Sequence, residues 1–331
     1  MKIFAVINQK GGVGKTTTVA NLGAAIASRG RKVCLLDLDP QAHLTLHFGI
    51  EPGEGQAGAY ELLTRNETSF SECLCRAGER LDVAPSVIDL AAAEVELAGA
   101  VGREQILRDK LRAEAANTAH DLMLIDCPPS LGLLTLNALA AADEVLIPLQ
   151  PHFLALQGLG KLLETVSLVQ RRINPQLRVG GVILCMYETT TRLAGEVVAD
   201  LEGFFEQSRG MDRPWADARI FATHIRRNVK LAECPSYGTT IFEYEPSSHG
   251  AADYASLADE FLAYLAGEPT SAELPTPPHP VEDAQPRQAP PVETAAEEHT
   301  DPAPPGDGPA EDPAPAPPTT LPPAEQDSPR L

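Results

Sequence analysis

The stretch QKGGVGKTT, residues 9–17, decides the organisation of this chain. Before it, residues 1–7 (MKIFAVI) form a short apolar run with β-branched side chains, which predicts a buried strand. After it, residues 17–30 carry apolar side chains at helical spacing, and Gly30 is placed to end the helix. The glycines therefore fall at a strand-to-helix turn, where backbone N–H groups and the helix N-terminus converge on anionic oxygens.

The end of this stretch fits the phosphate-loop pattern G-x-x-x-x-G-K-[ST] through Gly14, Lys15 and Thr16, whereas Gln9 occupies the first glycine position. We expect Lys15 to reach the β- and γ-phosphates of a nucleotide, and the Thr16 hydroxyl to bind Mg²⁺. Lys10 adds a second cation beside the same anion. The nucleotide-binding residues predicted on this basis are Lys10, Gly11, Gly12, Val13, Gly14, Lys15, Thr16 and Thr17.

Carboxylates follow two further apolar runs. Residues 32–37 (KVCLLD) predict a buried strand that ends in Asp37, with Asp39 two positions on, and residues 120–127 (HDLMLIDC) predict another that ends near Asp126. Open α/β sheets bind ligands at the carboxyl ends of their strands. We therefore predict that Asp126 holds Mg²⁺, directly or through water. Asp37 and Asp39 suit Mg²⁺ binding or the positioning of a water, and capping of the following turn remains the alternative for both.

Strand and helix patterns alternate along the chain, which predicts an α/β fold with a doubly wound, mostly parallel sheet of the P-loop NTPase type. Further strands are predicted at residues 80–84, 144–149, 177–186 and 219–224, and helices at residues 59–64, 87–98, 103–116, 155–173, 192–206 and 250–266.

Composition divides the 331 residues at one point. Residues 268–331 hold 19 of the 30 prolines and 13 Asp or Glu against two Arg, with no aromatic residue. Such a segment cannot bury enough apolar surface to offset its ordering entropy, so we expect residues 1–267 to be the folded domain and residues 268–331 a disordered acidic tail. The tail is interpreted as a solvated spacer, or as a partner-binding segment in extended Pro conformation.

Charge is divided at the same point. The tail carries −11 of the net −20 and leaves −9 for the body, which argues mildly against nucleic-acid binding. Between residues 161 and 230, however, 11 Lys or Arg stand against 8 Asp or Glu. The six cysteines have neither disulfide-framework nor metal-site spacing. No secretory signal and no apolar run near 18 residues is present, so we expect a cytoplasmic protein without integral membrane contact.

Four strings now carry a resemblance: NQKGGVGKTTT, LLDLDPQ, IDCPPSLGLLTLNAL and RRNVKLAECPSYG, which begin at residues 8, 35, 125 and 226. Through them the chain resembles the ParA/MinD family of P-loop ATPases, whose loop is the deviant Walker A motif. The resemblance covers about residues 1–265 and is closest to the ParA (Soj-like) partitioning branch. It implies an ATPase that uses ATP and Mg²⁺ and segregates chromosome or plasmid DNA.

The resemblance also implies roles for single residues. Lys10 is implied to reach across an ATP-bound homodimer to the nucleotide of the partner, and Asp39 to orient the water that attacks the γ-phosphate, with Asp37 in support. The implied catalytic set is Lys10, Lys15 and Asp39, with Thr16 and Asp126 at the metal. The chain departs from the family at residues 42–44, where Ala-His-Leu replaces the usual Gly-Asn-Ala, and residues 208–218 look like an insertion.

Family members bind DNA nonspecifically through arginines in the later part of the chain, and a ParB-like partner stimulates their hydrolysis. The candidates here are Arg192, Arg226, Arg227 and Lys230, and a solvated loop or a dimer contact is the alternative for each. Arg226 stands where the family usually has Pro. The resemblance thus implies a nucleoid-associated protein.

Three other functions remain open at this stage. A MinD-like positioning ATPase would use a basic amphipathic C-terminal helix, whereas this sequence ends in an acidic, Pro-rich segment. A reductase like the nitrogenase iron protein needs two cysteines poised for a bridging cluster, and the six cysteines form no convincing set. A ParA-like ATPase that positions a protein cargo is the third.

Overall fold

The computed structural model describes residues 1–53, 55–115, 118–152, 154–188 and 192–268. The predicted tail at residues 268–331 lies, apart from Glu268, outside the described residues, as does the end of the helix predicted at 103–116. The described part belongs to one compact unit that begins at Met1.

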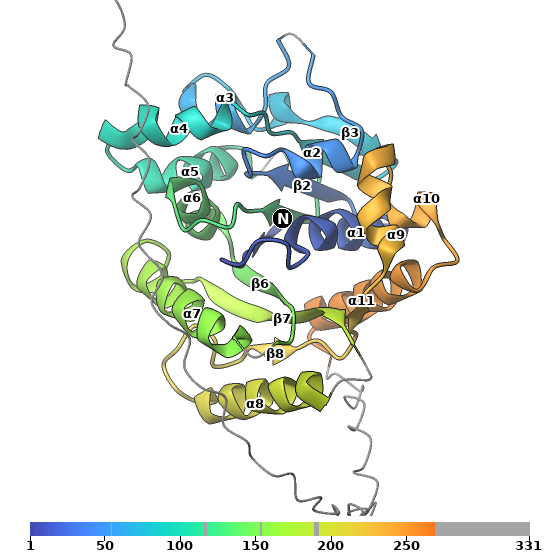
Figure 1. Cartoon of the computed structure of the whole chain (residues 1–331). Helices are drawn as coiled ribbons and strands as arrows, with labels where there is room; N and C mark the ends of the chain where they lie inside the picture. The colour runs from blue at the N-terminus through green and yellow to red at the C-terminus, as the bar shows by residue number, and fades with distance from the viewer. Residues whose placement is uncertain (54, 116–117, 153, 189–191, 269–331) are drawn as a thin grey trace, which may run out of the picture. The chain divides into compact units, whose positions relative to one another are not determined.

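The described strands form one sheet in the order β3-β4-β2-β5-β1-β6-β7-β8, and β9 pairs with β7 (Figure 1). All pairs are parallel except β3 with β4, which confirms the predicted doubly wound, mostly parallel sheet. The strands are β1 (Lys2–Val6), β2 (Val33–Asp37), β3 (Cys75–Gly78), β4 (Leu81–Ala84), β5 (Leu122–Asp126), β6 (Glu144–Leu149), β7 (Arg178–Tyr187), β8 (Arg219–Ile220) and β9 (Ile225–Arg226).

Helices connect the strands. The α-helices are α1 (Lys15–Ser28), α2 (His43–His47), α3 (Ala59–Thr64), α4 (Leu90–Glu96), α5 (Ile106–Ala113), α6 (Leu133–Ala141), α7 (Ala155–Arg172), α8 (Arg192–Ser208), α9 (Val229–Glu233), α10 (Ile241–Tyr244) and α11 (His249–Leu265). The 3₁₀ turns are η1 (Ser71–Cys73), η2 (Leu97–Gly99), η3 (Arg103–Gln105) and η4 (Cys234–Tyr237). Among the described helices, none is long and apolar enough to cross a membrane.

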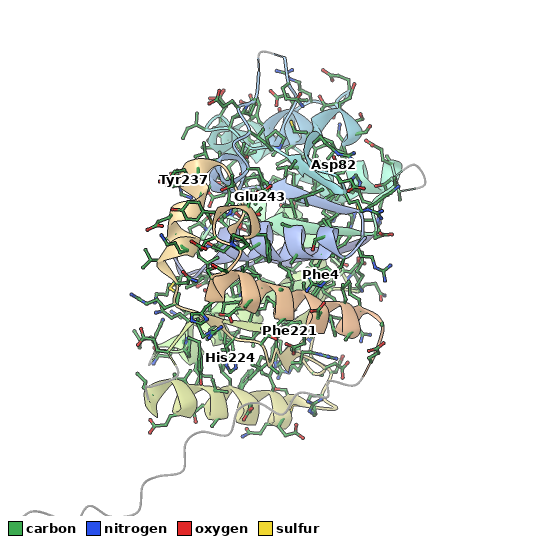
Figure 2. The ribbon with its side chains drawn as sticks, turned by 90° about the vertical axis from the view of Figure 1, so that its right-hand side faces the viewer. Phe4, Asp82, Phe221, His224, Tyr237 and Glu243 are labelled. Atoms are coloured by element: carbon green, nitrogen blue, oxygen red, sulfur yellow. The ribbon has the colours of Figure 1, made fainter. Side chains whose placement is uncertain are left out.

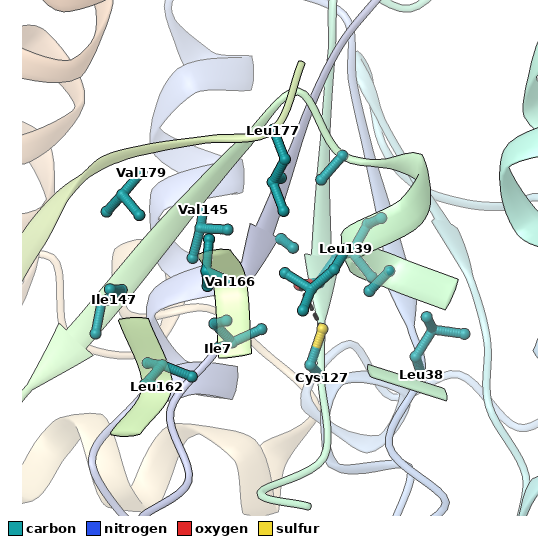
Figure 3. Close-up of a cluster of buried hydrophobic side chains, with 14 of the residues drawn as sticks. Ile7, Leu38, Cys127, Leu139, Val145, Ile147, Leu162, Val166, Leu177 and Val179 are labelled. Carbon is teal, nitrogen blue, oxygen red and sulfur yellow. Dashed lines mark hydrogen bonds between the residues drawn. The ribbon is translucent and has the colours of Figure 1, made fainter. Parts of the chain in front are cut away.

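Alternating side chains of the central strands build a core on each face of the sheet. On β1, Phe4 and Val6 join the cluster formed with α1 and α11, whereas Ala5 joins the cluster formed with the helices of the other face, where α6 and α7 lie. Figure 3 shows side chains of this second cluster around Cys127, a buried free thiol. Because both faces are covered, the central strands read as continuous apolar runs.

Aromatic rings fix α11 against the sheet. The ring centroids of Phe4 and Phe261 lie 5.0 Å apart in an edge-to-face arrangement, and Phe221 lies 6.0 Å from Phe261. Figure 2 looks onto this side, with Phe4 and Phe221 labelled beside α11. Three buried rings therefore join the first strand, the last helix and the segment after β8.

The structure differs from the sequence predictions mainly in short elements. The single strand predicted at 219–224 is two strands, β8 and β9, which pair with different parts of β7. The helix predicted at 87–98 is shortened to Leu90–Glu96 and ends in a 3₁₀ turn. Strand β3 was not predicted, because four residues ending in Gly78 carry too few alternations to be recognised.

Candidate functional site

The glycine-rich loop connects β1 to α1 as the sequence predicted. Helix α1 begins at Lys15, and Gly14 precedes it with φ 92°, while Gly12 has φ 71°. Both values lie in the left-handed region that side chains with a Cβ avoid. A Cβ built at Gly11 or Gly12 would meet no described atom within 4 Å, so the loop borders open space on its backbone side. That space is available to the oxygens of a phosphate chain.

Sheet register brings the carboxylates to this loop. Asp126 is paired in register with Val6 of β1 on one side and with Asp37 of β2 on the other. The three strand ends therefore meet at one edge, with the Lys15 side chain, 7% exposed, at the start of the neighbouring helix. This convergence is the one that the carboxyl-end rule for parallel sheets predicts.

Thr16 and Asp126 are in direct contact. The Thr16 hydroxyl donates a hydrogen bond of 2.7 Å to Asp126 Oδ2, while the buried Oδ1 of the same carboxylate has no hydrogen-bond partner among the described residues. Burial and the nearby Asp37 carboxylate raise the pKa of Asp126 well above its ordinary value. A hydroxyl beside an unsatisfied buried carboxylate fits Mg²⁺, which takes one or two carboxylates and completes its shell with water and phosphate oxygens.

Hydroxyl and carboxylate oxygens are hard ligands, which suit Mg²⁺, Ca²⁺ or Mn²⁺ rather than soft metals. Within the described ranges, no group of three or more His, Cys, Asp or Glu side chains is placed to hold a metal ion. An ion at Asp126 would thus depend on ligands from a nucleotide and water. This is the behaviour of Mg²⁺ at phosphate-transfer sites.

Asp37 has its oxygens occupied by the segment that follows it. It is fully buried and accepts hydrogen bonds from the Asp39 amide (3.1 Å), the Thr45 amide (2.9 Å) and the Thr45 hydroxyl (2.7 Å). Burial raises the pKa of Asp37 to about 6, and the hydrogen bonds from Thr45 oppose that rise. Asp37 therefore positions the segment carrying Asp39, and sequence analysis missed Thr45 because no motif marks it.

Asp39 lies two residues beyond Asp37, the last residue of β2. Its Oδ1 accepts from the Gln41 amide at 3.0 Å, and the side chain remains 8% exposed. Ala42 follows with φ 53°, a conformation that favours glycine, and it caps α2. Residues 42–44, where Ala-His-Leu replaces the Gly-Asn-Ala usual in the family, therefore begin with an alanine in a strained backbone conformation.

Lys10 lies on the exposed side of the loop. Its ammonium nitrogen is 2.7 Å from His152 Nε2 and 3.5 Å from Gln150 Oε1, both on the segment after β6. The structure therefore places Lys10 against its own chain. Neither contact partner was predicted from the sequence.

The basic candidates are engaged with acidic groups to different degrees. Arg226 donates through its guanidinium and its backbone amide to Asp253, whose side chain is 9% exposed. Arg227 lies 3.5 Å from Glu188 with both side chains largely exposed, and Lys230 bonds Glu233 at 2.8 Å. Arg192 begins α8, and its side chain is outside the described part.

A hollow of about 430 Å³ lies at the opposite edge of the sheet, where β1, β5 and β6 begin. Three of its polar side chains contact one another, because Glu144 pairs with Lys2 at 3.1 Å and accepts a hydrogen bond from Tyr264. Open α/β sheets bind ligands at the other end of their strands. The loop edge is therefore the candidate nucleotide site.

Comparison with known proteins agrees with this geometry. The family described as an AAA domain matches residues 1–179. The sporulation initiation inhibitor protein Soj of Bacillus subtilis is 43% identical over 262 residues, which are 79% of this chain and 98% of that protein. The chromosome partitioning protein ParA of Myxococcus xanthus is also 43% identical, over 79% of this chain and 88% of its own.

One similar solved structure carries a nucleotide. It is described as cobyrinic acid a,c-diamide synthase from Mycobacterium smegmatis with bound ADP and magnesium. It is 36% identical to this chain, with a TM-score of 0.66, and the match covers 82% of this chain and 100% of that one. The nucleotide and ion in that structure are the two ligands that the loop and the Asp126 carboxylate fit here.

Proposed function

Because this chain belongs to the ParA and Soj family of P-loop ATPases, with ATP and Mg²⁺ as its ligands, we propose that it couples ATP binding to dimerisation and nonspecific DNA binding. Hydrolysis, stimulated by a ParB-like partner, then releases it. The single observation that carries the ATPase assignment is the contact of Thr16 with Asp126 at the end of the glycine loop. The partitioning role is supported by the relatives that are named for it.

Binding and charge stabilisation would come from fixed groups of the loop. The amides around Gly12 and Gly14 and the N-terminus of α1 would face the phosphates, and Lys15 would neutralise charge on the transferring phosphoryl group. Thr16 and Asp126 would hold Mg²⁺, which supplies electrostatic stabilisation of the phosphate oxygens when bound.

Hydrolysis needs a water that is oriented toward the γ-phosphate, and we assign the orientation of that water to Asp39. Its carboxylate is held by the Gln41 amide while its backbone is fixed by Asp37, so it is oriented before a nucleotide binds. Lys10 would supply a second cation to the nucleotide of the partner subunit across the dimer. Such a cation in trans would stabilise transition-state charge as an arginine finger does.

DNA contacts are proposed for the exposed cations near α9. Arg227 and Lys230 have carboxylate neighbours that are themselves exposed, so phosphates could replace them at low cost. Arg226 and Arg192 remain candidates, with Arg226 bound to a nearly buried partner. We further propose that residues 1–267 act as the ATPase domain, that residues 268–331 are a separate acidic tail, and that the protein acts on the nucleoid in the cytoplasm.

The test is binding of random-sequence duplex DNA to the full chain with ATP and with ADP over a salt series. We expect binding with ATP that weakens steeply as salt rises, since phosphate contacts release counterions. Lys15→Ala, which removes the phosphate-binding cation, is the control and should bind in neither state. If the wild-type protein binds no DNA with either ATP or ADP but still dimerises with ATP, the partitioning role is refuted. That result would favour an ATPase that positions a membrane or protein cargo.

A further inference from the structure

The Lys10 side chain has two defined contacts on its own chain. Its ammonium group contacts His152 Nε2 at 2.7 Å and Gln150 Oε1 at 3.5 Å. The Lys10 backbone is also held in place. Its amide donates to Asn8 Oδ1 at 3.0 Å, and Asn8 Nδ2 in turn donates to Pro148 O at 2.7 Å. Backbone and side chain of Lys10 are thus both tied to the end of β6 and the residues just after it.

The sheet explains why these residues meet. Strand β6 lies beside β1, with Val6 in register with Leu146, and the Ile7 amide donates to Leu146 O at 3.0 Å. The chain that leaves β6 therefore runs alongside the loop that leaves β1. Gln150 and His152 therefore reach Lys10 from the segment that directly follows β6.

We propose that His152, assisted by Gln150, is a positioning residue that holds the Lys10 ammonium on its own subunit until ATP is bound and a second subunit arrives. The inference rests on the proposed function, in which Lys10 acts on the partner subunit. Lys10 then has two alternative acceptors, the imidazole of its own chain and the nucleotide of the other. Exchange between them is the step that His152 controls.

The chemistry of the contact makes it reversible. The Lys10 ammonium donates, so His152 must be neutral with its Nε2 free to accept. Burial and the nearby Lys10 charge lower the pKa of His152, which favours that neutral form. The Leu154 amide donates to His152 Nδ1 at 3.2 Å, and a neutral imidazole accepts at only one nitrogen, so the tautomer that accepts from Leu154 is not the one that accepts from Lys10. Leu154 therefore competes with Lys10 and keeps the holding contact weak.

The energetic consequence is modest and measurable. A hydrogen bond from an exposed ammonium to a neutral acceptor shifts its equilibrium by about three- to tenfold. The homodimer uses one Lys10 from each subunit, and each ammonium must first leave its own His152, so this factor lowers the apparent association constant twice. Removing the His152 acceptors should therefore strengthen association about ten- to a hundredfold.

The first experiment measures the contact without nucleotide. The full chain is treated with an amine-acylating reagent, and labelling rates of Lys10 and of the exposed Lys161 on α7 are followed by peptide mass spectrometry. We expect His152→Ala to raise the Lys10 rate about three- to tenfold and to leave the Lys161 rate unchanged. His152→Gln, which keeps an acceptor oxygen, should restore slow labelling of Lys10. Equal Lys10 rates in wild type and His152→Ala would overturn the proposal.

The second experiment measures association of the same three proteins by light scattering with Mg²⁺ and ATP. We expect tighter association for His152→Ala and a return toward wild type for His152→Gln. Faster Lys10 labelling with unchanged association would refute control of dimerisation by His152. Absence of ATP-dependent association in all three proteins, with faster labelling in His152→Ala, would refute the proposed function while leaving the holding contact in place.

Discussion

The hydroxyl of Thr16 donates to Asp126 Oδ2 at 2.7 Å, and the other oxygen of Asp126 is buried without a partner in the described part of the chain. Described protein groups thus pair only one oxygen of this carboxylate. A buried acceptor without a partner costs free energy, and Mg²⁺ at Asp126 would remove that cost.

Asp126→Asn should therefore separate stability from function. Without nucleotide, the variant should melt at or above the wild-type temperature, because a buried acidic group next to Asp37 has become neutral. With Mg²⁺, its affinity for ATP should fall about tenfold or more, since the carboxylate assigned to hold Mg²⁺, directly or through water, is lost. Thermal melting and nucleotide titration with and without Mg²⁺ measure the two effects. Asp121→Asn, just before the opposite end of β5, is the control, and equal Mg²⁺ dependence in both variants would contradict the metal assignment.

Two neighbouring arginines should behave differently when replaced by alanine. Arg226→Ala removes the guanidinium from the nearly buried Asp253 carboxylate and leaves it only the backbone amide of residue 226, so we expect a loss of about 1–2 kcal/mol in unfolding free energy. Arg227→Ala removes an exposed pair with Glu188 and should change stability by less than about 0.5 kcal/mol. Urea unfolding measures both changes.

In the DNA titration, Arg227→Ala should weaken binding and lower the slope of log affinity against log salt by about one. Unchanged DNA binding in Arg227→Ala would remove Arg227 from the interface.

The close approach of Gly238 to Gly49 predicts a stability effect outside the phosphate loop. A Cβ on Gly238 would lie 2.8 Å from Gly49 Cα, and Gly238 has φ +63°. Gly238→Ala should therefore destabilise the protein by about 1–3 kcal/mol through backbone strain and steric overlap. Gly203→Ala is the control, because it lies within α8 with no described atom within 4 Å of its Cβ and should stabilise by about 0.5–1 kcal/mol. Equal unfolding midpoints for the two variants would show that the contact between Gly49 and Gly238 is not maintained in solution.

Burial of His47 predicts how stability depends on acid. The side chain is 1% exposed, and burial lowers the pKa of His47 to about 4. Between about pH 4 and pH 6.5 the unfolded chain binds a proton that the folded chain does not, so this group makes stability fall as the pH is lowered through that window. The full effect is about 3 kcal/mol for a shift of this size. Asp37, with its pKa raised to about 6, has the opposite slope, so the comparison must be between variants.

His47→Gln isolates the histidine contribution, since Asp37 is common to both proteins. The difference in unfolding free energy between wild type and His47→Gln, measured in urea from pH 4 to pH 8, should change across that window and be constant above about pH 7. A difference that is independent of pH would mean that His47 is accessible to protons in the folded state.

The sequence alone predicted the elements that have long apolar patterns and the site residues whose chemistry a motif specifies. The central strands and α7 were found because both faces of the sheet are covered and their apolar runs are long. The meeting of Thr16 with Asp126 was expected because parallel strands align their carboxyl ends at one edge.

The remainder depends on contacts between distant residues, which no local pattern encodes. Thr45 holds Asp37 across eight positions, and His152 meets Lys10 across 142. The sequence marks Arg226 as a cation, but its partner Asp253 lies 27 positions away on α11, so the sequence did not distinguish Arg226 from Arg227. Short elements such as β3 and β9 were missed or merged because they are held by sheet pairing rather than by their own propensity.

The central claim is an ATP-closed dimer, and the molar mass of Asp39→Ala in solution tests it most directly. This variant should keep ATP bound, because it lacks the carboxylate assigned to the attacking water. With Mg²⁺ and ATP, multi-angle light scattering should give twice the 35.3 kDa mass of one chain, and with ADP the mass of one chain. Lys15→Ala should remain at the single-chain mass in both. A single-chain mass for Asp39→Ala with bound ATP would contradict the account.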